Sequence, residues 1–178
     1  MTVGDVITKP EEICSKLIEL VPPDREVVFA CVGTDRSTGD AFGPLVGARL
    51  QESGFDVIGT VENPMHGWNI DECLKALREA HPDRFVIGID ACLGTATHVG
   101  WINVENCPLR PGAGVNKQLS EVGDIHLAGV VNVAGFMEYF VLQNTRLALV
   151  LQMVENAVKG IQQFMETRSA MRLVAATV

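Results

Sequence analysis

Two aspartates, Asp40 and Asp90, are the residues in this sequence best suited to acid–base chemistry. Asp90 follows an apolar run over residues 85–89, and a carboxylate at the end of a buried strand is costly without a partner or a chemical task. Asp40 precedes a predicted helix, where an acidic side chain ordinarily caps the first turn. Two carboxyl groups in one confined site cannot both ionise easily, so one retains a proton. Such a pair can activate water against an amide bond.

Alternating strands and helices must position these two side chains. Apolar runs predict strands over residues 27–32, 56–61, 85–89, 101–104 and 125–131, and helical periodicity predicts helices over 10–20, 42–53, 70–80 and 136–167. The last helical region is interrupted near residues 144–145, residues 108–114 form a loop, and the residues after 168 are either a tail or an ordered end. This alternation predicts one doubly wound α/β domain over residues 1–178, with a core of about 26–166. Its sheet is mostly parallel, with helices on both faces.

Ligands of such sheets bind beyond the carboxyl ends of the strands, at the crevice where the strand order reverses. In a 2-1-3 order the first and third strands are neighbours, so Asp40 and Asp90 should face each other across this crevice. The helix N-terminus favours the charged form of Asp40, which leaves Asp90 as the group that holds the shared proton. We predict that the loops at the same strand ends supply substrate-binding residues, namely Thr34, Asp35, Ser37, Glu62, Asn63, His66 and Asn132.

The loop over residues 33–40 offers a different chemistry, because it joins a buried strand to a helix. It lacks the lysine of a P-loop and the spacing G-x-G-x-x-G. The hydroxyl-rich turn from Ser37 to Gly39 can still hold an anion at the helix N-terminus, although the charges of Asp35 and Asp40 oppose this. A phosphate or flavin binder is therefore a further hypothesis.

Cysteine and histidine chemistry has weaker support. Cys92 can be a nucleophile with His66 or His98 as its base, but a cysteine beside a buried strand is usually a small core hydrophobe. His126 lies inside a predicted strand and His81 at a helix end, so we interpret both as structural. A metal site built from Asp40, Asp90 and one histidine stays open, but no dense ligand motif occurs. We predict neither a metal nor a cofactor.

Composition and charge exclude several classes of partner. The chain has 178 residues with 14 Lys plus Arg against 22 Asp plus Glu, and its net charge of −8 argues against nucleic acid. The apolar stretch over 130–153 is interrupted by polar residues, so it is not a membrane span.

Five cysteines without a C-x-x-C pair favour a reducing compartment, and the N-terminus resembles no targeting signal, so we expect a cytoplasmic protein. The apolar stripe on the last helix widens at Leu149 and Met153, which suggests a homodimer face.

Three motifs together resemble the YyaC-type sporulation proteins, a spore-protease-like family of endospore formers. They are GTDRSTGDAFGPLVG over residues 33–47, ENPMH over 62–66 and IDA over 89–91. The resemblance extends over about residues 26–165. That family is in turn similar to the germination protease that degrades small acid-soluble spore proteins and, more remotely, to the hydrogenase maturation endopeptidases. PGAGVNK over 111–117 and GVVN over 129–132 also resemble stretches of the germination protease.

The resemblance implies a doubly wound α/β fold in which Asp40 and Asp90 match two acidic positions. Hydrogenase maturation endopeptidases bind nickel in their substrate with two acidic residues and a histidine, whereas residues 114–117 offer no metal ligand where that histidine would lie. The resemblance therefore implies a metal-independent, aspartic-type endopeptidase acting on a spore or sporulation protein, in the forespore or mother cell. The alternative is a non-catalytic sporulation factor that uses the same cleft to bind a peptide or protein partner.

Overall fold

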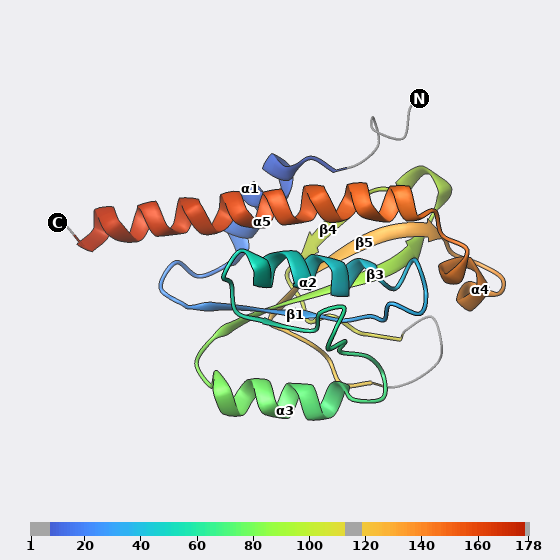
Figure 1. The fold of residues 1–178 in the computed structure, drawn as a ribbon. Coiled ribbons are helices and arrows are strands. Elements are labelled where there is room, and N and C mark those ends of the chain that lie inside the picture. The colour runs from blue at the N-terminus through green and yellow to red at the C-terminus, as the bar shows by residue number, and fades with distance from the viewer. Residues whose placement is uncertain (1–7, 113–118, 177–178) are drawn as a thin grey trace.

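A five-stranded sheet forms the centre of the molecule in the computed structural model, which describes residues 8–112 and 119–176. The strand order is β2-β1-β3-β5-β4 (Figure 1). The strands are β1 (Val27–Cys31), β2 (Val57–Ile58), β3 (Phe85–Gly94), β4 (Ile102–Glu105) and β5 (Ile125–Val133). Strands β2, β1, β3 and β5 run parallel, and β4 pairs antiparallel to β5. The mostly parallel sheet and the 2-1-3 order confirm the predicted topology.

Helices cover both faces of this sheet. They are α1 (Pro10–Leu20), α2 (Phe42–Glu52), α3 (Ile70–Ala80), α4 (Glu138–Gln143) and α5 (Leu147–Ala176), and a short 3-10 helix, η2, spans Ala96–His98. Helices α1, α2 and α5 pack on one face, whereas α3 packs on the other (Figure 1). The break between α4 and α5 falls where the sequence predicts one, and α5 continues through the residues that the sequence leaves as a tail or an ordered end.

Strand β1 shows why the sheet is doubly covered. All five of its residues are buried. Its Phe29 belongs to the core formed with α1, α2 and α5, while the adjacent Val28 and Ala30 belong to the core against α3. Because successive side chains of a strand point to opposite faces, a continuous apolar run has to be covered on both sides. The interpretation of residues 27–32 as a doubly buried strand is therefore confirmed.

Helix α2 lies unusually close to the sheet because glycines face it. A Cβ added to Gly47 would lie 2.0 Å from the carbonyl oxygen of Gly59, and one added to Gly43 would lie 2.0 Å from that of Val32 and 3.0 Å from that of Ile89. No side chain fits at these two positions without moving the backbone. The start of α2 is thereby held against the carboxyl ends of β1 and β3.

The C-terminal helix α5 contacts the segment that connects α1 to β1. It has 30 residues and is therefore about 45 Å long, and its last turns extend beyond the sheet (Figure 1). Arg168 is buried, and its guanidinium donates hydrogen bonds to the carbonyls of Val21, Pro22, Pro23 and Arg25 in the segment between α1 and β1. The acceptors are the C-cap residue of α1, Val21, and residues of the loop that follows, so Arg168 links α5 to the connection between α1 and β1.

The residues that widen the apolar stripe of α5 belong to the core. Met153 is buried, and Leu149 is partly buried against the same core. They therefore do not form an exposed face, and the homodimer stays a prediction. In the described part of the chain, no helix combines the length and the apolar character that a membrane crossing requires.

The contact between α2 and the sheet can be tested by adding one methyl group. We expect Gly47→Ala to lower the free energy of unfolding by about 3 kcal/mol, because overpacking outweighs the higher helix propensity of alanine. Urea unfolding followed by circular dichroism measures the change. The control is Gly67→Ala, an exposed position where the new methyl would meet only the flexible end of Leu119 at 3.3 Å. A Gly47→Ala protein as stable as the parent would contradict the close contact.

Candidate functional site

Asp90 lies inside β3 and not at its end, which corrects the sequence-based expectation. Strand β3 continues to Gly94 because β5 goes on pairing with it on one side. On the other side β1 has already ended, since the last pair between β1 and β3 joins Cys31 to Ile89. Asp90 is therefore the first residue of β3 beyond the end of β1, and it is partly buried. One oxygen of its carboxyl group accepts a hydrogen bond from the N–H of Ala91 at 2.8 Å.

Asp40 is carried by the loop that connects β1 to α2. This loop closes on itself, because the N–H of Thr34 donates to the carbonyl oxygen of Asp40 at 3.2 Å. Gly33 has a φ of 142°, and a Cβ there would lie 2.0 Å from that same oxygen, so this closure requires glycine. Helix α2 begins at Phe42 with Ala41 as its N-cap residue. The ordinary capping role considered for Asp40 is therefore not the one it takes.

The two aspartates line one open cleft of about 730 Å³. Its floor is formed by β3 and β5 with Ala91 and Ala128. One wall is formed by Glu105, the last residue of β4, and by residues of the segment that follows it, up to Gly112. The opposite wall is α4, which contributes Glu138, Tyr139 and Leu142. The structure thus brings Asp40 and Asp90 together at the β1/β3 switch point, where the sheet topology predicts a ligand site.

Both carboxyl groups have raised pKa values. Burial raises the pKa of Asp90 well above its usual range, its bond from Ala91 opposes this, and the charge of Asp40 raises it further. Burial also raises the pKa of Asp40, which the hydroxyl of Ser37 partly offsets. Ser37 is buried, and although it lies close enough to Asp40 to favour its charge, its hydroxyl forms no well-aligned hydrogen bond within the described residues. Asp90 is consequently the group that more readily keeps its proton.

No ion pair within the described ranges involves either aspartate. Arg36, the cation nearest to them in sequence, is exposed. Arg110 lines the cleft, but its guanidinium bonds to Glu121 at 2.8 Å. Within residues 8–112 and 119–176, therefore, no arginine or lysine neutralises this pair of carboxyl groups.

His126 and Cys92 also line the cleft. The Nδ1 of His126 lies 2.8 Å from the carbonyl oxygen of Cys107, which can only accept, so Nδ1 is the donor of this hydrogen bond. The structural interpretation of His126 rests on its place inside a predicted strand, and the sequence alone does not show that this strand, β5, lies next to β3. Burial, and then the charges of Asp90 and Glu105, raise the pKa of the Cys92 thiol to about 11. A protonated thiol is a poor nucleophile, which argues against that role for Cys92.

All seven of the predicted substrate-binding residues lie outside the lining of this cleft. Thr34, Asp35 and Ser37 belong to the loop that carries Asp40. Glu62, Asn63 and His66 belong to the segment after β2, which is held against the end of β1 by a bridge between Val32 and Met65. The Nδ1 of His66 accepts a hydrogen bond from the backbone N–H of Trp68 at 3.3 Å. A role of these six residues in substrate binding stays a prediction.

Asn132, the seventh, has its side chain engaged within the protein. Its amide nitrogen donates to the carbonyl oxygen of Val141 and to the hydroxyl of Thr145, both at 3.2 Å, and its oxygen accepts the N–H of Val133 at 2.9 Å. It therefore joins the end of β5 to α4 and the turn that follows.

The described residues provide no ligand set for a metal site built from Asp40, Asp90 and a histidine. No three His, Cys, Asp or Glu side chains among them are arranged to hold an ion. The stretch over residues 114–117, which the resemblance identifies as lacking a metal ligand, lies outside the described residues, as does most of the glycine-rich motif over 111–117. Neither interpretation is therefore tested by the structure.

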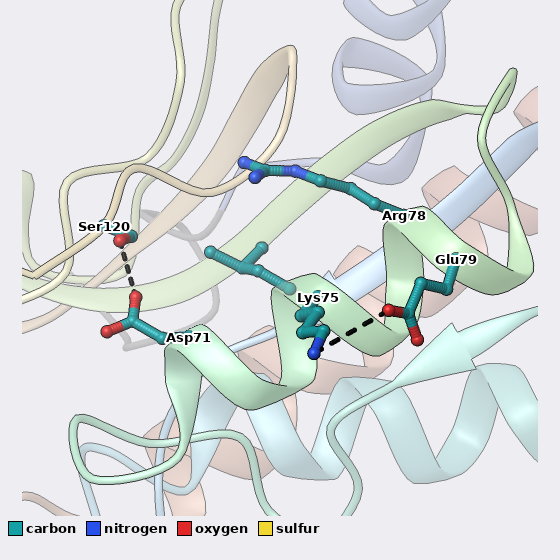
Figure 2. A pocket seen from close by; sticks show the side chains of 6 residues that line it. Asp71, Lys75, Arg78, Glu79 and Ser120 are labelled. Carbon is teal, nitrogen blue, oxygen red and sulfur yellow. Dashed lines mark hydrogen bonds and ion pairs between the residues drawn. The ribbon is translucent and has the colours of Figure 1, made fainter.

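A smaller cavity of about 350 Å³ lies along α3, on the other face of the sheet (Figure 2). Its polar groups bond mainly to one another. Asp71 accepts a hydrogen bond from Ser120, and Lys75 forms an ion pair with Glu79 at 3.9 Å. Arg78 extends away from these pairs (Figure 2). This arrangement of exposed, paired charges offers no catalytic group comparable to the two aspartates.

The family described as "Protein of unknown function (DUF1256)" matches residues 6–160. The chain belongs to the DUF1256 family. The "Uncharacterized protein YyaC" of Bacillus subtilis (strain 168) is 49% identical over 140 residues, which cover 77% of this chain and 68% of that protein. The resemblance to YyaC-type proteins is thereby confirmed.

Two solved structures share the fold of this DUF1256 protein. The [NiFe] hydrogenase maturation protease HycI from Thermococcus kodakarensis KOD1 superposes with a TM-score of 0.57 at 17% identity, covering 84% of this chain and 99% of that one. The [NiFe] hydrogenase maturation protease HybD from Thermococcus kodakarensis gives 0.51 at 12% identity, covering 78% and 97%. At these identities the likeness shows the α/β fold of hydrogenase maturation proteases and not their chemistry.

The burial of Asp90 predicts a measurable pH dependence of stability. In the unfolded chain an aspartate ionises at about pH 3.9. Between that pH and the raised folded pKa, the native state binds a proton that the unfolded state has released, so stability falls as pH rises. Asp90→Asn keeps an acceptor for Ala91 and has no charge to bury. We therefore expect it to be more stable than the parent at neutral pH, by about 1.4 kcal/mol for each unit of the pKa difference.

Urea unfolding between pH 4 and pH 8 measures this effect. Asp35→Asn, which removes an exposed carboxylate from the loop beside Asp40, is the matched control and should follow the parent. If the stability of Asp90→Asn declined with pH as steeply as that of the parent, another group would be responsible.

Proposed function

We propose that this DUF1256 protein is a metal-independent endopeptidase that hydrolyses a peptide bond in a spore or sporulation protein. The observation that carries the proposal is that two carboxyl groups, those of Asp40 and Asp90, line one solvent-accessible cleft, have raised pKa values and form no ion pair with any described residue. A carboxylate and a carboxylic acid side by side provide a base and an acid at the same pH.

The reaction then needs only these two groups and water. The Asp40 carboxylate removes a proton from water as its oxygen attacks the peptide carbonyl carbon, and Asp90 gives its proton to the carbonyl oxygen, forming a gem-diol. Asp40 next donates its new proton to the nitrogen while the C–N bond breaks. One hydroxyl of the gem-diol returns a proton to Asp90, which leaves a carboxylic acid, an amine and the enzyme in its starting state.

The substrate class rests on the family. The chain shares 49% identity with YyaC, and its motifs resemble those of the germination protease. A protease-like fold supports a polypeptide substrate. We further propose that the protein acts in the cytoplasm of the forespore or mother cell.

The proposal predicts that Asp40→Asn and Asp90→Asn each reduce cleavage by about 10³-fold, the scale of one lost acid or base. The full-length protein is incubated with an extract of sporulating cells of an endospore former, and new peptide N-termini are identified by mass spectrometry. Asp83→Asn, which removes an exposed carboxylate outside the lining of the cleft, should cleave like the parent, and EDTA should leave the rate unchanged. Cleavage that persists in either cleft variant would overturn the mechanism.

A non-catalytic partner-binding role is the second candidate. It is favoured by exposed apolar side chains in and just before α4, the helix that forms one wall of the cleft, because Phe136 is 89% exposed, Tyr139 58% and Phe140 53%. Such a patch is typical of a surface that another polypeptide covers. The same extract distinguishes the two functions: a captured protein that acquires no new N-terminus supports binding alone, whereas processing supports the peptidase.

A further inference from the structure

Helix α4 forms one wall of the candidate cleft, yet none of its residues is fully buried. It is entered through Met137, which has a φ of 57°, a left-handed conformation that is unfavourable for methionine. Leu142 packs partly against the core. Because packing holds this wall only weakly, its position depends on polar contacts.

Asn132 supplies those contacts from the sheet. Its amide nitrogen bonds to the carbonyl of Val141 and to the hydroxyl of Thr145, and that hydroxyl donates in turn to the carbonyl of Val141 at 3.0 Å. Thr145 is buried, at 6% exposure. The Asn132 amide, the Val141 carbonyl and the Thr145 hydroxyl thus satisfy one another in a partly buried environment, where an unpaired polar group is costly.

The same turn touches the residue before Asp40. The N–H of Gly39 donates to the carbonyl oxygen of Leu142 at 2.9 Å. A Cβ on Gly39 would lie 2.9 Å from a methyl carbon of Leu142 and 3.1 Å from the Thr145 hydroxyl, so the two backbones are in close contact. A shift of the end of α4 therefore has to move Gly39 and, with it, Asp40.

We propose that Asn132 is a positioning residue of the candidate site, which sets the place of Asp40 relative to Asp90 through Thr145, Leu142 and Gly39. The inference rests on the proposed function, because the position of Asp40 has a chemical consequence only if Asp40 reacts. It assigns Asn132 a role other than the substrate contact that the sequence suggested. The contacts themselves can be tested without a substrate.

The test compares Asn132→Ala with Asn144→Ala. Asn144 is a matched control, because its amide also donates to a carbonyl of α4, that of Phe140 at 2.8 Å, but it is exposed and reaches no strand. Two readouts are used, namely amide hydrogen exchange at Gly39 and the carboxyl ¹³C titration of Asp40 by NMR. Residue-specific NMR separates Asp40 from the other titratable or charged groups that line the cleft, which are Asp90, Cys92, Glu105, Cys107, Arg110, His126, Glu138 and Tyr139.

In Asn132→Ala we expect exchange at Gly39 to be at least tenfold faster, while buried amides of β1 exchange as in the parent. Water then reaches Asp40, so its pKa should move down toward the ordinary range, since burial is the main cause of its elevation. Asn144→Ala should change neither readout. Thr145→Val, which removes the shared hydroxyl at nearly constant shape, should repeat the effect if Asn132→Ala folds poorly.

Faster exchange in α4 with an unchanged Gly39 and Asp40 would overturn the proposal, and so would unchanged exchange in both segments. Neither result depends on cleavage. If the peptidase assay fails but exchange at Gly39 becomes faster in Asn132→Ala, the proposed function is rejected and the contact between Asn132 and Gly39 stands. If cleavage depends on Asp40 but exchange does not change in Asn132→Ala, only the role of Asn132 is rejected.

Discussion

The close contact between α2 and the sheet is the constraint on which the candidate site depends. Gly43 meets the backbone of both Val32 and Ile89, so the first turn of α2 is fixed over the gap where β1 ends and β3 continues. The connecting loop has to reach that turn from the end of β1 within ten residues, 32–41. It does so by closing back on Thr34, which leaves Asp40 at the mouth of the gap into which Asp90 is exposed.

The electrostatics of the cleft oppose the stability of the fold. Two carboxyl groups that pair with no cation among the described residues, and whose pKa values are both raised mainly by burial, are less stable than an amide or apolar pair would be. Proteins commonly retain such unfavourable groups at sites where the same environment supplies reactivity. Here the unfavourable group sits on β3, the central strand, which is held by pairing with both β1 and β5 and can tolerate the cost.

Features set by local periodicity could be predicted from the sequence, and those set by neighbours could not. The bounds of α1 and α3 agree with the predicted ranges 10–20 and 70–80, because each helix has one apolar face and clear termini. The length of β3 depends instead on β5, which keeps it extended beyond residue 89. The pairing of Asp40 with Asp90 follows from the strand order, whereas the inclusion of His126 requires the register between β3 and β5. The contacts of Asn132 join segments that no sequence pattern connects.

The link between Arg168 and the segment after α1 bears on how the chain folds during synthesis. Helix α1 packs mainly against α5, about 150 residues later in the chain. Four carbonyl groups in the segment after α1 receive their hydrogen bonds from the Arg168 guanidinium only once α5 has been made. At ribosomal rates of about 5–20 residues per second, the apolar face of α1 has no partner for roughly ten to thirty seconds. The central parallel strands can pair earlier than this, so the first helix to be made is among the last to dock. In a nascent chain of this protein, therefore, Ile13 and Leu17 lack their partners on α5 for most of its synthesis.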